Sequence, residues 1–187
     1  MELSPRDVVV VLKLVASGPQ KWTYAKLGQE LCLSPSQVFR SVFSAGAAHL
    51  LDNSSLPSPP GIGKTQAHRA LQSRPSRANL KEFLIHGVKY AFPVERGGLT
   101  RGVPTADAAP PLSQQLAQTF LAPAVWPYAE GSVRGIEFSP LYKNVPAAAM
   151  RDPKLYELLA LVDAIREGRA REREIAIREL TGRIDSA

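Results

Sequence analysis

Six polar side chains between residues 34 and 44 have the chemistry and the spacing to contact DNA. Arg40 can donate two hydrogen bonds to a guanine, Gln37 can pair with an adenine, and serine hydroxyls can bind phosphates or either base. The six residues are Ser34, Ser36, Gln37, Arg40, Ser41 and Ser44. On a helix that begins after Ser34, the other five would face outward. Such a narrow polar face fits a major groove ~12 Å wide. The alternative is an ordinary three-helix packing unit with a polar outer face.

A capped helix must carry these side chains. Ser34 and Pro35, with Gln37 three residues after the serine, predict a helix start with reciprocal capping bonds. We expect this helix to continue to about Leu51. Its first turn would place the positive end of the helix dipole near the phosphates.

Two helices should precede it. Ser4 and Pro5 predict a first helix over residues 6–17, and Thr23 predicts a second over residues 24–31. Gly28 is small enough for a close approach of the second helix and the one that follows it. The side chains expected to form their joint core are Leu27, Leu31, Leu33, Val38 and Val42.

Residues 25–42, and above all LSPSQVFR at residues 33–40, resemble the helix-turn-helix of winged-helix bacterial transcriptional regulators of the broad MarR-like superfamily. The resemblance covers about residues 1–104. It implies a further helix, which residues 79–86 can supply, and a β-hairpin wing, which residues 88–103 can supply. It also implies that Arg96 and Arg101, on either side of a Gly-Gly turn, reach the minor groove or the backbone from the wing.

A second motif could bind phosphate in another way. Residues 58–65, SPPGIGKT, match the phosphate-binding loop pattern GxxxxGK[ST] except for Ser58 in place of the first glycine. No hydrophobic strand leads into it, and no later strand ends in an aspartate that could hold magnesium. We therefore interpret residues 52–78 as a basic flexible linker or insertion, with Lys64 near DNA phosphates. We expect no enzymatic activity and no catalytic residue.

The charge distribution favours a polyanionic partner. The chain has 187 residues and a net charge of +6, and residues 53–104 hold 8 Lys and Arg against 2 Asp and Glu. Residues 1–52 hold 5 against 4. The segment that would contact bases is therefore nearly neutral, and we expect residues 53–104 to make most of the contacts with phosphates.

The second part of the chain has mixed character. Residues 124–127 and 132–138 predict a hairpin, and Asp152 with Pro153 starts the first of two amphipathic C-terminal helices. Their Leu and Ile faces suit a dimer or a docking partner, or equally the core of one chain. We expect an α+β, mainly helical fold: a winged helix-turn-helix over residues 1–104 and a mixed α/β region over residues 105–187.

These observations define the expected function. We expect a cytoplasmic, sequence-specific regulator that binds double-stranded DNA, acts as a homodimer and represses a promoter by occlusion. The alternative is a protein-interaction module, an antitoxin or adaptor, whose region 105–187 binds a protein partner. Because Cys32 is the single cysteine and the three histidines have no neighbouring ligands, we expect no metal and no cofactor. No segment predicts a membrane span.

Overall fold

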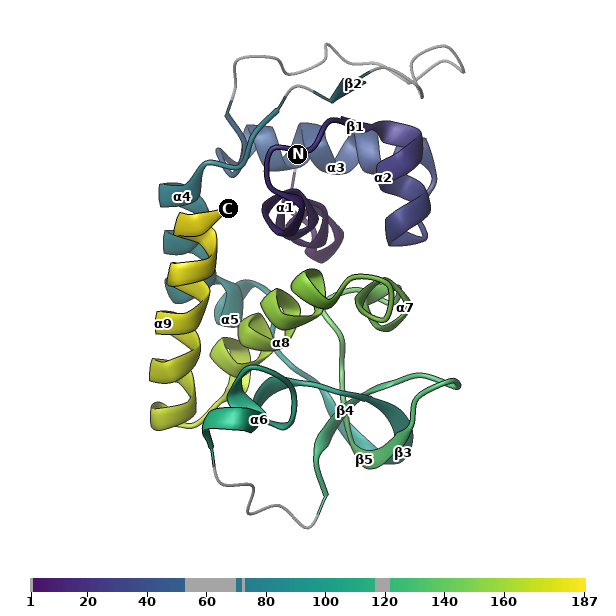
Figure 1. Cartoon of the computed structure of the whole chain (residues 1–187), viewed down its shortest axis with the longest axis vertical. Helices are drawn as coiled ribbons and strands as arrows, with labels where there is room; N and C mark the ends of the chain where they lie inside the picture. Colours follow the sequence, from purple (N-terminus) through teal and green to yellow (C-terminus); the bar gives the residue numbers. More distant parts are fainter. Residues whose placement is uncertain (1, 53–69, 72, 117–121) are drawn as a thin grey trace.

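A computed structural model describes residues 2–52, 70–71, 73–116 and 122–187 of the chain. The fold is α+β and mainly helical, as expected. The three N-terminal helices are α1 (Pro5–Ser17), α2 (Tyr24–Leu31) and α3 (Pro35–Ala47), and the short strands β1 (Trp22–Thr23) and β2 (Ala70–Leu71) pair antiparallel beside them (Figure 1). A reciprocal cap forms at the start of α3, whereas at the start of α1 only the Asp7 carboxylate accepts from Ser4 N, at 2.8 Å. Helix α3 ends four residues before the expected Leu51.

The helix expected over residues 79–86 is longer than its caps predict. It begins as α4 (Arg77–Glu82), passes through the π-helical turn η3 (Phe83–Gly87) and ends as α5 (Val88–Ala91). Val88 is fully buried, so packing carries the helix through a glycine that would otherwise end it. The first arm of the expected wing is therefore helical.

The strands differ from both expected hairpins. Strand β3 (Arg96–Pro104) runs through Gly97 and Gly98, where its register shifts, and pairs antiparallel with β4 (Ala124–Pro127) and with β5 (Val133–Phe138). Strands β4 and β5 pair with each other in parallel, which closes the three strands into a ring. The hairpin wing over residues 88–103 and the hairpin over residues 124–138 are thus wrong, because non-local pairing with β3 overrides the local turn signals.

The ring is narrow enough to require glycine at two ladder positions. A Cβ on Gly102 would lie 1.9 Å from the Trp126 carbonyl oxygen, and one on Gly135 would lie 2.1 Å from that of Pro123. Both positions therefore face β4. By alternation along a strand, the residues just before them, Arg101 and Arg134, point away from the ring.

The C-terminal helices belong to the core of the chain. Helix α8 (Pro153–Glu167) packs against α1, α5 and α9 (Ala170–Ser186), with the short helix α7 (Val145–Ala149) beside its start (Figure 1). The remaining short helices are η4 (Ala106–Ala108) and α6 (Leu112–Gln115). One hydrophobic core joins the described residues on both sides of the boundary expected at residue 104. Of the two roles open for the Leu and Ile faces, packing within the chain is the one observed.

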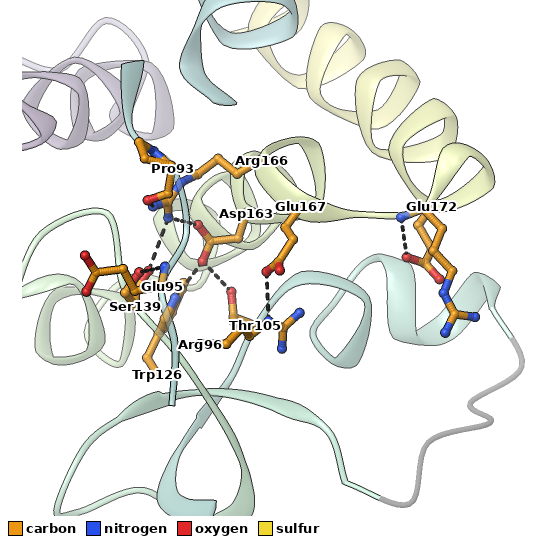
Figure 2. Close-up of polar contacts among 11 residues, drawn as sticks. Pro93, Glu95, Arg96, Thr105, Trp126, Ser139, Asp163, Arg166, Glu167 and Glu172 are labelled. Carbon is orange, nitrogen blue, oxygen red and sulfur yellow. Dashed lines mark hydrogen bonds and ion pairs between the residues drawn. The ribbon is translucent and has the colours of Figure 1, made fainter. Parts of the chain in front are cut away.

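A buried polar network fixes α8 to the strands. Figure 2 shows the carboxylate of Asp163, which accepts hydrogen bonds from Thr105 Oγ1 at 2.8 Å and Trp126 Nε1 at 2.6 Å. Arg166 completes the set at 2.7 Å. Burial raises the pKa of Asp163, and these three donors oppose the rise. Arg166 also donates to the backbone carbonyls of Phe92, Pro93 and Ser139.

Among the described residues, none of the helices has the length and apolar character needed to cross a bilayer.

Candidate nucleic-acid interface

The turn between α2 and α3 has the close packing that the sequence predicts. Leu33 N donates to Gly28 O at 2.8 Å, and a Cβ on Gly28 would lie 2.5 Å from the Leu33 carbonyl oxygen. Cys32 ends α2 in the left-handed conformation with φ 55°. All five side chains expected in the joint core are buried: Leu27, Leu31, Leu33, Val38 and Val42. The helix-turn-helix geometry is therefore set by backbone contact at a glycine.

The rest of the molecule holds this turn from outside. Asn144, just before α7, donates to the carbonyl oxygen of Cys32 at 2.6 Å. Arg151 donates to the carbonyl oxygen of Gln29 at 3.0 Å. Both acceptors lie at the C-terminal end of α2, where carbonyl oxygens lack the regular bonds of the helix; Gln29 O also accepts from Cys32 N at 3.4 Å. The turn is thus braced against the C-terminal part of the chain.

The first turn of α3 uses two of the predicted contact residues as caps. Ser34 Oγ accepts from Gln37 N at 3.2 Å, and Gln37 Oε1 accepts from Ser34 N at 2.8 Å. The cap uses one of the two lone pairs of the Gln37 amide oxygen and fixes the direction of the side chain, while its NH₂ group makes no bond within the cap. The NH₂ group can donate to base acceptor atoms such as guanine N7 and O6.

Two predicted residues, Ser36 and Arg40, form an exposed stripe along α3. Arg40 makes no hydrogen bond or ion pair with any residue that the structure describes, and the remaining residues include no Asp or Glu. Pro35 has no N–H, and the N–H of Gln37 is used by the cap. The N–H of Ser36 is therefore the one among the first three residues of α3 that a phosphate could reach.

Ser41 and Ser44 do not lie on this stripe, which corrects the sequence prediction. Both side chains are buried, and Ser41 Oγ accepts from Arg6 Nε on α1 at 2.9 Å. The reason is that α3 packs against α1 as well as α2, so two of its faces are covered. Helical spacing alone does not show which polar positions meet the other helix.

The predicted wing arginines lie away from α3. Along the long axis of the molecule, α7 and α8 lie between α3 and the ring of β3, β4 and β5 (Figure 1). Arg96 forms an ion pair with Glu167 at 2.8 Å (Figure 2). Its guanidinium group also lies 4.7 Å from the centroid of the Phe138 ring. Arg101 is exposed on β3. The wing placement that the resemblance implies for these two residues is not the one observed.

The basic segment after α3 starts and returns beside the helix-turn-helix. Leu51 pairs with Pro75, and β2 pairs with β1, so the chain leaves at Asp52 and returns at Ala70 next to α1 and α3. Lys64 and the GxxxxGK[ST]-like sequence lie outside the described residues.

Sequence inspection missed a basic feature at β1. The ammonium groups of Lys13 and Lys26 lie 5.4 and 5.2 Å from the ring centroid of the buried Trp22. Lys21, the preceding residue, is exposed and has no ionic partner among the described residues. The only signal in the sequence was the alternation of lysines with an aromatic residue around positions 21–26.

The chain matches no family model, no curated protein and no solved structure.

Proposed function

We propose that the protein binds double-stranded DNA through α2 and α3 and acts as a sequence-specific transcriptional regulator. The observation that carries the proposal is Arg40: an exposed guanidinium that has no ionic partner among the described residues, on the outer face of the second helix of a tightly packed helix-turn-helix. A helix so placed can enter the major groove with its first two turns against base edges.

Each available group has a role in this proposal. Arg40 donates two parallel hydrogen bonds to a guanine, and the NH₂ group of Gln37 donates to a neighbouring acceptor. The hydroxyl and N–H of Ser36 bind a backbone phosphate. Lys21 adds an exposed positive charge at the start of β1, on the same part of the molecule. Specificity therefore rests on few contacts, with Arg40 first among them.

Repression by promoter occlusion is the mechanism we propose with it. Because the apolar faces of α8 and α9 pack within the chain, we propose that a single copy is the basic DNA-binding unit. Two copies on adjacent half-sites would protect two helical turns of about 34 Å each. The length of a nuclease footprint distinguishes one bound copy from two.

The test is selection of bound sequences from a random duplex library, followed by fluorescence anisotropy with the selected and a scrambled duplex. We expect the wild-type protein to prefer the selected duplex by at least 10³-fold at physiological salt. Arg40→Ala should lower affinity for the selected duplex by about 5–150-fold, equivalent to 1–3 kcal/mol, and should reduce the preference for guanine at one position.

The matched control is Arg171→Ala. Arg171 is also exposed and has no ionic partner among the described residues, but it lies on α9. It changes the net charge by the same amount and should leave the sequence preference unchanged. Equal affinity of the wild-type protein for selected and scrambled duplexes would refute sequence-specific binding.

A further inference from the structure

Two arginines lie directly opposite each other across the strand ladder of β3 and β5. Arg101 and Arg134 are register partners, and both are exposed. Their neighbours Gly102 and Gly135 face β4, so both arginines point to the outside of the ring. In an antiparallel ladder, the Cβ atoms of opposite residues are about 4.5–5.5 Å apart. Two guanidinium groups are thereby held on one surface.

Neither charge is neutralised by a residue that the structure describes. Arg101 and Arg134 form no ion pair and no side-chain hydrogen bond with the residues described, and the remaining segments contribute no carboxylate side chain. The nearest glutamate along the β4–β5 connection, Glu130, instead accepts a hydrogen bond from Tyr128 Oη at 3.3 Å. Like charges placed opposite each other destabilise a ladder. A bound anion would remove that cost.

The pair lies next to the last register pair of the β3–β5 ladder, Gly102 and Val133. Tyr128 N donates to Arg101 O at 3.1 Å, which fixes this tyrosine beside the arginine. Partial burial raises the pKa of Tyr128, and so do Glu130 and Cys32, whereas the charge of Arg151 lowers it. Arg151, which lowers this pKa, donates to the carbonyl oxygen of Gln29 on α2.

We infer that Arg101 and Arg134 form a clamp for a phosphodiester group of nucleic acid, separate from the contact surface of α3. A planar guanidinium donates two parallel hydrogen bonds to phosphate oxygens, and two of them on one surface can bind one phosphate or two successive ones. The clamp contacts backbone rather than bases, so it increases affinity without changing sequence preference. This inference rests on the proposed DNA binding for its ligand.

The experiment compares the wild-type protein with Arg101→Gln/Arg134→Gln in fluorescence anisotropy at several salt concentrations. Loss of two phosphate contacts should reduce the slope of log K against log salt by about two and weaken binding about tenfold at 50 mM salt. The ranking of sequences should stay the same. The control is Arg171→Gln/Arg173→Gln, which removes the same charge from α9.

A second measurement does not depend on DNA. Arg134→Gln should raise the Tm at low ionic strength by about 1–2 °C, because it removes the like-charge repulsion. Pyrophosphate should raise the Tm of the wild-type protein and leave that of the double variant unchanged.

The outcomes separate the clamp from the proposed function. If the wild-type protein binds DNA and the double variant binds it with the same affinity and salt slope, the clamp is wrong and the function of α3 stands. If the wild-type protein binds no duplex but pyrophosphate stabilises it through these arginines, the proposed function is wrong and the pair is an anion site. If neither DNA nor pyrophosphate depends on the pair, the inference is overturned.

Discussion

Lys13 and Asp152 are separated by 139 residues, yet the Lys13 ammonium donates a 2.8 Å hydrogen bond to the Asp152 carboxylate. Lys13 lies on α1 and also contacts Glu30 of α2 at 3.4 Å. Asp152 caps the start of α8 by accepting from Lys154 N and Leu155 N. This buried lysine therefore connects the helix-turn-helix to the central helix of the fold.

Lys13→Met should lower the free energy of unfolding by about 2 kcal/mol, because it leaves the carboxylates of Asp152 and Glu30 without their cation. Lys21→Met, at an exposed lysine, should change it by less than about 0.5 kcal/mol. Urea denaturation followed by circular dichroism measures both. Equal effects of the two substitutions would contradict a structural role for the Lys13 contacts.

The same pair predicts a pH dependence. Burial by itself raises the pKa of Asp152, but the hydrogen bond and charge of Lys13 and the bonds from α8 bring it below its ordinary value of 3.8. A lowered carboxyl pKa adds stability above the ordinary value and loses it as the pH falls through the folded value. The stability difference between wild type and Lys13→Met should therefore narrow below about pH 3.8.

Gly28→Ala should lower the free energy of unfolding by about 1–3 kcal/mol, since the new Cβ would collide with the backbone at Leu33 and force the two helices apart. Gly182→Ala is the matched control, because a Cβ there meets nothing within 4 Å on α9. We expect it to raise the free energy of unfolding by up to about 1 kcal/mol. Thermal and urea denaturation test both, and a neutral Gly28→Ala would show that the turn is not closely packed.

Ser41→Ala and Ser36→Ala should have opposite consequences. Ser41→Ala removes the hydrogen bond to Arg6 and should cost about 1 kcal/mol of stability, with DNA affinity within twofold of wild type. Ser36→Ala should leave stability unchanged within about 0.5 kcal/mol and weaken DNA binding severalfold. Denaturation and anisotropy are measured on both proteins. If Ser41→Ala keeps its stability but loses DNA affinity, the Ser41 side chain faces outward, as helical spacing predicts.

Tyr156 should lose its proton only at high pH, and the free energy of unfolding should fall as it does so. Its hydroxyl donates to Pro104 O at 2.7 Å, and burial raises its pKa to about 12. A raised tyrosine pKa contributes stability that is complete below the ordinary value of 10.0 and is lost as the pH rises towards 12. Tyr156→Phe should lose about 1 kcal/mol at neutral pH and show a shallower decline above pH 10. Parallel pH profiles of the two proteins would contradict this assignment.

The sequence by itself determined the elements whose signals are local. The serine and threonine caps, the prolines that begin α1 and α3, and Gly28 were sufficient to place α1, α2 and the start of α3, because capping and close approach involve residues only a few positions apart. The start of α8 followed from Asp152 and Pro153 for the same reason.

Tertiary structure decided which faces and strands meet. Packing of α3 against α1 buries Ser41 and Ser44, and pairing of β3 with β4 and β5 runs a strand through a Gly-Gly that looked like a turn. It also sets Arg134 opposite Arg101, 33 positions away in the chain. Strand register and the choice of the buried helix face depend on contacts between distant segments, which a local pattern of residue types does not predict.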